Sequence, residues 1–370
     1  MKLFNSSGFR RFTSLPAIQN LLLFFSVFGP ATITAMSDND AGGVATYSVA
    51  GATLGYPILF LLAIVTVLLA ITQEMGMRLT LVTRRGLADL IRERFGVKAS
   101  VAIFAALLIA NLGTITVDVA AIKTSSAMLH LPVIPFMIAI VAVSLLVVTR
   151  GNYKLTQGIM LFTSLFYLTY IVSAVKAKPD WGMALSNIVY PHGVDFTPAY
   201  LRKYLIIGMG VLGTTITPWG QFFISSFAYD KNIEPGKIFF SQLETYIGAF
   251  LTDFFSFFMI VATASTLFIH GIPLTSGEDA ARAIQPFAGD LAGTLFALGI
   301  LTAGFMGMIV VALSTAYSFA EFFGLSGSLD SNFKQSKSFY LLFSSQILIA
   351  ALVALIPEIS LFRLAIITQT

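Results

Sequence analysis

A series of ten long apolar runs, separated by short charged or Pro- and Gly-rich breaks, occupies almost the whole 370-residue chain. A helix needs about 20 apolar residues to cross the hydrocarbon core of a bilayer. Only 11% of the residues are charged, against about a quarter in soluble domains, which excludes an ordinary soluble enzyme. We therefore predict an all-α polytopic membrane protein. The predicted spans lie near 17–52, 57–83, 99–123, 132–149, 156–176, 203–228, 237–269, 287–322, 338–356 and from 359 onward.

The distribution of Lys and Arg predicts the orientation of these spans, because the cytoplasmic segments of membrane proteins are enriched in both. With the N-terminus in the cytoplasm, 15 of the 22 basic residues fall in cytoplasmic segments. The net charge of +4 then reflects topology, so we expect the cell membrane as the location, the lipid bilayer as a partner and no nucleic acid. The run from 359 has about a dozen residues, too few for a crossing, so the tenth helix is expected to be truncated.

Polar residues interrupt the first span between Ser37 and Gly43, where the sequence reads Ser-Asp-Asn-Asp-Ala-Gly-Gly. The two carboxylates, Asp38 and Asp40, cost about 2.5 to 3.5 kcal/mol each at membrane depth. Paired glycines also weaken a helix. Unwound backbone is tolerated at this depth only where it lines a cavity or is buried in protein. The first span is therefore predicted to be a broken helix in the interior of the protein.

The sixth span has a matching interruption between Gly213 and Gln221, where Pro218 removes a backbone donor and disfavours the preceding helical turn. Five spans separate the two breaks. Broken helices at equivalent places in two halves are typical of inverted-repeat transporters, whose substrate site lies at the midplane. We predict a single transporter domain over 1–370, with repeats at about 17–176 and 203–370. Freed carbonyls and helix C-terminal ends at such breaks suit a cation.

The residues around both breaks resemble the NRAMP family (natural resistance-associated macrophage proteins), divalent-metal transporters with the LeuT fold. The segment GPATITAMSDNDAGGVATYSVAGATLGY at 29–56 is similar to the family's first helix, with Asp40-Ala41-Gly42-Gly43 in the place of its Asp-Pro-Gly-Asn break. Further similar segments are TQEMGMRLTLVTRRGLADLIRERFG, TVDVAAI, GTTITPWG and LFALGILTAG. The resemblance covers nearly the whole chain and implies a LeuT-like 5+5 inverted repeat with helices 1 and 6 broken.

The resemblance also implies a metal site. It makes Asp40 the carboxylate ligand, Thr214 the source of a backbone carbonyl and Gln369 a glutamine of the tenth helix that joins the site. Gly43 stands in the place of the family's asparagine and Thr217 in that of its metal-binding methionine. The remaining departures are Trp219, which replaces a histidine, and Ala121, which replaces an acid three positions after Asp118.

These departures predict a hard cation. A thioether favours soft or borderline transition metals, so a threonine in its place leaves a site made only of oxygens. Mg²⁺ keeps several of its waters, and Gly43 would leave room for them. Loss of the histidine and of the second acid removes groups that relay protons. The pattern is similar to the prokaryotic NRAMP-related magnesium transporters, which implies import of Mg²⁺ and of Mn²⁺ without proton coupling.

Two alternatives stay open. One is a proton-coupled Mn²⁺/Fe²⁺ importer of the ordinary NRAMP type, which would need Asp38 and Asp118 as proton carriers or ligands. The other is a transporter-like membrane receptor that signals through a partner. No nucleophile triad, phosphate-binding loop or metalloprotease motif is present, so we predict no enzyme and no bound cofactor, with Mg²⁺ or Mn²⁺ as substrate. A monomer is compatible with the sequence.

The other acids in the spans have several interpretations. Asp38, Asp118 and Trp219 are assigned to a vestibule or to a supporting position beside the metal. Asp118 could instead neutralise Lys123, which lies five residues further on. Glu74 and Arg78 have the i,i+4 spacing of a structural ion pair. Asp253 has no evident partner and is a further candidate for a polar lining residue.

Overall fold

A computed structural model of the chain describes residues 16–274, 290–356, 364–365 and 368, and the regular elements within them are helices. The first half contains α2 (Pro16–Val27), α3 (Pro30–Ser37), α4 (Ala41–Leu54), α5 (Ile58–Thr83), α6 (Leu87–Met128), α7 (Val133–Arg150), α8 (Tyr153–Ser164), η1 (Leu165–Tyr167) and α9 (Leu168–Lys176). The second half contains α10 (Trp181–Val189), α11 (Pro198–Thr215), α12 (Pro218–Asp230), η2 (Pro235–Lys237), α13 (Ile238–Thr263), η3 (Ala264–Phe268), α15 (Asp290–Phe323) and α16 (Lys337–Ala354).

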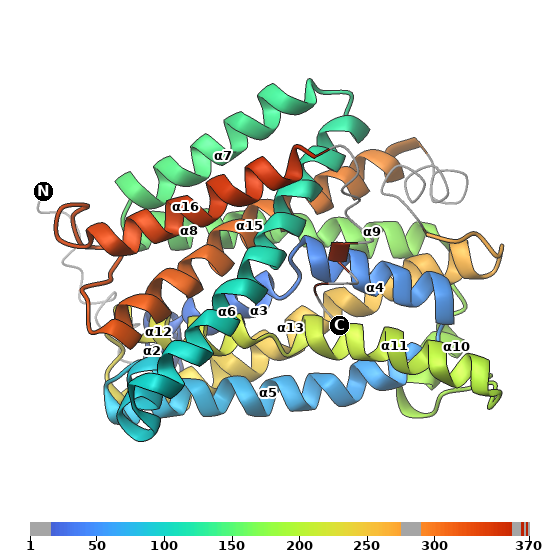
Figure 1. The fold of residues 1–370 in the computed structure, drawn as a ribbon. Helices are drawn as coiled ribbons and strands as arrows, with labels where there is room; N and C mark the ends of the chain where they lie inside the picture. The colour runs from blue at the N-terminus through green and yellow to red at the C-terminus, as the bar shows by residue number, and fades with distance from the viewer. Residues whose placement is uncertain (1–15, 275–289, 357–363, 366–367, 369–370) are drawn as a thin grey trace, which may run out of the picture.

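The helices form a bundle of long, roughly parallel rods, with the short helices α3 and α4 in its middle (Figure 1). Among the described residues, seven helical segments are long and apolar enough to cross a membrane. Many of their large apolar side chains face outward, including Val67 of α5 and Ile138 of α7. Lipid is the solvent that makes such a surface stable, as predicted for a polytopic membrane protein.

The two broken helices lie at the centre of the bundle. Both α3 and α4 pack against α13 and α15, while α11 lies beside α4 and α12 beside α3. The most extensive helix pair is α6 with α15, the third and eighth predicted spans. Small residues permit this close packing, since a Cβ on Gly304 of α15 would lie 2.6 Å from the backbone oxygen of Asp118 in α6.

The first predicted span, near 17–52, proves to be three helices rather than one helix with a single break. α2 ends at Val27, and the chain turns at Gly29, whose φ of 141° is not available to a residue with a side chain at ordinary cost. The carbonyl of Phe28 accepts hydrogen bonds from Lys231 and, at 2.8 Å, from Gln157. The sequence did not show this second break, because the partners that satisfy its backbone groups come from distant helices.

The segment between the second and third predicted spans is helical and is continuous with the third span. α6 begins at Leu87 and bends at Gly96, where φ is 80° and ψ is 174°. The short helix α10, between the fifth and sixth spans, was not predicted. It begins at Asp180, whose carboxylate caps the helix by accepting a hydrogen bond from Met183 N.

Candidate functional site

Asp40 begins α4, and its carboxylate turns back onto the first turn of that helix. It is the N-cap residue, in an extended conformation, and its Oδ1 accepts a hydrogen bond from Gly43 N at 2.8 Å. The side chain is only 1% exposed. The partial positive charge of the helix N-terminus offsets part of its negative charge. A Cβ on Gly43 would lie 2.7 Å from the backbone oxygen of Asp38, so this tight turn requires glycine.

Asn39 fixes the first break in place. Its Nδ2 donates to the carbonyl and the hydroxyl of Thr252 on α13, at 2.8 and 3.0 Å, and its Oδ1 accepts from Ser256 at 2.8 Å. Its backbone oxygen accepts from the Tyr167 hydroxyl at 2.9 Å. The unwound segment is therefore held by α13 and by the η1 turn between α8 and α9, as buried irregular backbone must be.

The second break places two oxygens of Thr214 at the end of α11. In a continuous helix its carbonyl would accept from residue 218, but that residue is Pro218, which has no N–H. The Thr214 hydroxyl is buried and has no hydrogen-bond partner. A Cβ built on Gly43 would lie 3.4 Å from Thr214 Oγ1 and 3.6 Å from Asp40 Oδ1. The Thr214 hydroxyl and Asp40 Oδ1 therefore both border the space beside this glycine, and the predicted role of the Thr214 carbonyl stays a prediction.

Asp118 of α6 meets Asp40 at a glycine of α15. Its Oδ1 accepts a hydrogen bond from Ala41 N at 3.1 Å, and its Oδ2 has no partner. A Cβ on Gly307 would lie 2.5 Å and 2.6 Å from the two Asp118 oxygens and 2.6 Å from Asp40 Cβ. The Asp118 carboxylate and the Asp40 side chain thus meet at one point of α15. Sequence reasoning missed Gly307, because only the packing of three helices defines its role.

Asp38 belongs to a second polar group. Its Oδ2 accepts from Gln73 Nε2 of α5 at 2.9 Å, and its Oδ1 accepts from the Thr217 hydroxyl at 3.4 Å. Thr217 is the N-cap of α12, and its Oγ1 also accepts from Gly220 N at 3.3 Å. The structure therefore brings Thr217 to Asp38, whereas the resemblance had grouped it with Asp40. Gln73 was not among the predicted residues.

Trp219 and Gln369 complete the predicted set. Trp219 is buried in the main apolar core, and its backbone oxygen accepts from the Ser314 hydroxyl of α15 at 2.8 Å. This contact joins α12 to α15. Gln369 lies outside the described residues, so its predicted place at the metal stays a prediction.

Asp118 does not neutralise Lys123. The Lys123 ammonium donates instead to the carbonyls of Ala354 and Ile356, at 3.0 and 3.3 Å, at the end of α16. A helix C-terminus stabilises a cation there. The departure at Ala121 also has a physical reason, since its Cβ would lie 3.2 Å from a Cβ on Gly304. The close contact of α6 with α15 leaves no room for an acidic side chain at that position.

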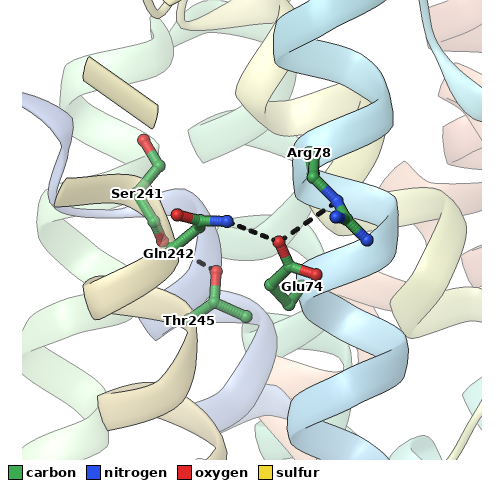
Figure 2. Close-up of polar contacts among 5 residues, drawn as sticks. All are labelled: Glu74, Arg78, Ser241, Gln242 and Thr245. Atoms are coloured by element: carbon green, nitrogen blue, oxygen red, sulfur yellow. Dashed lines mark hydrogen bonds and ion pairs between the residues drawn. The ribbon is translucent and has the colours of Figure 1, made fainter. Parts of the chain in front are cut away.

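Glu74 is part of a separate polar contact between α5 and α13 (Figure 2). Its Oε1 accepts from Gln242 Nε2 at 2.7 Å and pairs with Arg78 Nε at 3.3 Å. The predicted i,i+4 ion pair is therefore confirmed. These three side chains point toward one another in the figure, so Glu74 has a structural role.

The centre of the bundle is buried and rich in oxygen acceptors. The side chains of Asp38, Asp40 and Asp118 are at most 1% exposed, and none of them forms an ion pair within the part of the chain that the structure describes. No group of three or more His, Asp or Glu side chains that could hold a metal is present among those residues. Neutral oxygens and the carboxylates of two different helices would therefore have to share the coordination of a cation.

A multi-pass helical protein with two broken helices around such a centre belongs to the class of LeuT-like transporters. Solved transporter structures share this fold. The chain superposes on a manganese transporter of Eremococcus coleocola with a TM-score of 0.74, at 16% identity, covering 96% of this chain and 76% of the other. A Na⁺-coupled sialic acid symporter gives a TM-score of 0.62, at 12% identity, with 88% and 72% covered. The fold is a LeuT-like 5+5 inverted repeat with helices 1 and 6 broken.

The chain belongs to the natural resistance-associated macrophage protein-like (Nramp) family, whose model matches residues 31–370. A relative in Burkholderia ambifaria, the divalent metal cation transporter MntH, is 28% identical over 292 residues. The match covers 76% of this chain and 65% of the relative, just under two thirds of its length. The family confirms the predicted resemblance, and its members are membrane transporters rather than enzymes.

Proposed function

We propose that this protein imports divalent metal cations, Mg²⁺ and Mn²⁺, across the cell membrane by alternating access and without proton coupling. The observation that carries the proposal is the meeting of Asp40 and Asp118 at Gly307, together with the unpartnered Thr214 hydroxyl that borders the same space as Asp40 Oδ1 beside Gly43. Two carboxylates and neutral oxygens are ligands of the kind that Mg²⁺ and Mn²⁺ prefer. The relatives named above, a divalent metal cation transporter and a manganese transporter, support a divalent metal as the substrate class.

Selectivity for hard cations is supported by the threonine at position 217. Thr217 stands where a thioether would favour softer metals, and the side chains around Asp40 and Asp38 supply oxygen or an amide nitrogen that is already donating. Mg²⁺ is commonly held through one or two carboxylates while it keeps several waters. The acids on α4 and α6 fit that requirement.

Proton-coupled transport of Mn²⁺ is the second candidate, and one observation favours it. Asp118 Oδ2 is buried beside Asp40 without a partner, so this carboxyl could carry a proton that metal binding releases. The proposal of uncoupled transport is supported instead by Trp219 and Ala121, which replace the other two groups suited to a proton relay. Because a resting cell is negative inside, about 2.3 kcal/mol per charge per 100 mV favours import of an uncoupled cation.

The test is ion uptake into proteoliposomes that contain the protein, with a Mg²⁺ indicator and a pH dye read in the same vesicles. We expect uptake of Mg²⁺ and Mn²⁺ without acidification of the lumen. Asp40→Ala should abolish uptake, while Glu74→Gln serves as the matched control because its carboxylate is committed to Gln242 and Arg78. Retained uptake by Asp40→Ala would refute the assigned role of this carboxylate, and Mn²⁺ uptake with acidification would establish the proton-coupled alternative.

A further inference from the structure

Asp253 of α13 is a carboxylate without a partner in the interior of the bundle. Its side chain is 4% exposed, and neither of its oxygens accepts a hydrogen bond. The Thr66 hydroxyl of α5 lies close to it but donates to the Leu62 carbonyl at 2.8 Å. A buried charge with no compensation costs several kcal/mol. A bound cation would compensate this charge.

The surroundings of Asp253 show where such a cation would lie. On one side is a cavity of about 330 Å³ between α5, α10 and α13, lined otherwise by apolar side chains and Thr66. It offers too few oxygens to replace the water shell of an ion. Asp253 also lies close to the first break, because Asn39 Nδ2 donates to the Thr252 carbonyl at 2.8 Å, and Asp38 and Asp253 are the chain neighbours of these two residues. The buried Tyr47 of α4 shares a hydrogen bond with the Thr215 hydroxyl at 2.7 Å.

Gln73 supplies a second oxygen without a partner at the same place. Its Nε2 donates to Asp38 Oδ2 at 2.9 Å, so its Oε1, bonded to the same carbon atom, is held within a few ångströms of that carboxylate. This Oε1 is completely buried and has no hydrogen-bond donor. The unpartnered side-chain atoms of this group are therefore all acceptors, on Gln73 and Asp253. Buried oxygen acceptors without donors are the groups that hard divalent cations bind.

We propose that Asp38 and Asp253, with Gln73 Oε1 and the Thr217 hydroxyl, form a second binding position for a divalent cation. This position is distinct from the one at Asp40 and Asp118, and the inference rests on the proposed function. The ligands come from α5, α13 and both broken helices, so the ion would bind where the two halves of the fold meet. Two carboxylates and two neutral oxygens suit a partly hydrated Mg²⁺ or Mn²⁺.

Two bound divalent ions would balance the negative charges at the centre of the bundle. Four carboxylates lie around the breaks, and none forms an ion pair within the described ranges. One divalent ion at Asp40 and Asp118 leaves the charges of Asp38 and Asp253 uncompensated. A second ion at the second position balances them. The ion at either position is close enough to weaken binding at the other, because like charges repel strongly in an interior of low dielectric.

The experiment is a Mn²⁺ titration of the purified protein in nanodiscs, with free Mn²⁺ followed by its electron paramagnetic resonance signal. We expect two bound ions per protein. Asp253→Asn and Asp40→Asn should each bind one, and Glu74→Gln, the matched removal of a buried carboxylate elsewhere, should still bind two. Gln73→Met should weaken one of the two sites at least tenfold, and it provides a second variant if Asp253→Asn does not fold.

Each outcome separates this inference from the proposed function. One ion bound by the unmodified protein, or two retained by Asp253→Asn, would overturn the second position and leave metal transport intact. No Mn²⁺ bound at all would overturn both. Two ions in the unmodified protein, with the loss of a different one in each Asn variant, would establish the second position. Competition of Mg²⁺ at both positions is expected, because both consist of oxygen ligands.

Discussion

Replacement of Gly307 by alanine is the sharpest test of the site, because it adds one methyl group at the point where the Asp118 carboxylate meets the Asp40 side chain. That methyl would lie 2.5 and 2.6 Å from the oxygens of Asp118 and 2.6 Å from Asp40 Cβ. Nonbonded carbon atoms pack at about 3.5 to 4.0 Å. Either α15 or the two acids must therefore move by about 1 Å.

The energy of this displacement follows from two opposing effects. Overpacking of a tight interior costs about 1 to 3 kcal/mol. Alanine is more favourable than glycine within a helix by about 1 kcal/mol, which offsets part of that cost in the overall stability. The higher helix propensity of alanine does not offset the loss in metal affinity, because the strain is relieved by moving the proposed ligands Asp40 and Asp118. We expect the affinity for Mn²⁺ to fall about 5- to 100-fold, since 1.4 kcal/mol corresponds to a factor of ten.

The assay compares Mn²⁺ affinity, initial uptake rate and thermal unfolding in detergent for Gly307→Ala with those of a matched control. Gly158 of α8 provides the control, since a Cβ there meets nothing within 4 Å. Gly158→Ala should leave affinity and uptake unchanged and should stabilise the fold slightly. If Gly307→Ala binds and transports Mn²⁺ like the unmodified protein, Asp40 and Asp118 do not form the metal position.

Three further outcomes are expected. Asp118→Asn keeps an acceptor for Ala41 N but removes one charge, so Mn²⁺ affinity should fall at least tenfold in isothermal titration with the unfolding midpoint nearly unchanged. Thr217→Met adds a thioether near Asp38, so Cd²⁺ should inhibit Mg²⁺ uptake more strongly than it does in the unmodified protein. Unchanged inhibition by Cd²⁺ would show that position 217 does not set selectivity. Glu244 accepts three hydrogen bonds at the start of α3, from Gly29 and twice from Thr32, so Glu244→Gln should lower the free energy of unfolding by about 1–2 kcal/mol, measured by denaturant titration.

Much of the architecture was predictable because lipid makes membrane spans long and apolar. The runs near 57–83 and 132–149 match α5 (Ile58–Thr83) and α7 (Val133–Arg150) to within a residue. The break between α2 and α3 was not predictable, since it depends on Lys231 and Gln157, which cap α2 from distant helices. Local sequence determines where a helix can form, and tertiary contacts determine where a long one divides.

The sequence also identified the acids of the site but not how they group. Asp38 and Asp40 are two residues apart, and nothing in their spacing indicates that one turns to Gln73 and the other to the side of Asp118 and Gly307. Asp40 has an extended conformation, so Asp38 and Asp40 do not have the relative side-chain directions of residues i and i+2 in a helix. Gln73 precedes Glu74 in the second predicted span, and only its contact with Asp38 reveals its role.

If metal binds both at Asp40 and Asp118 and at Asp38 and Asp253, the number of bound ions predicts whether protons move during transport. The four carboxylates around the breaks are almost completely buried, and each costs about 2.5 to 3.5 kcal/mol at membrane depth if it stays charged and unpaired. A closed centre must therefore be neutralised. Two divalent ions achieve this without protons, whereas one ion leaves two carboxylates that only protons can neutralise. Two bound Mn²⁺ ions should thus accompany uptake without acidification, and one bound ion should accompany uptake with it.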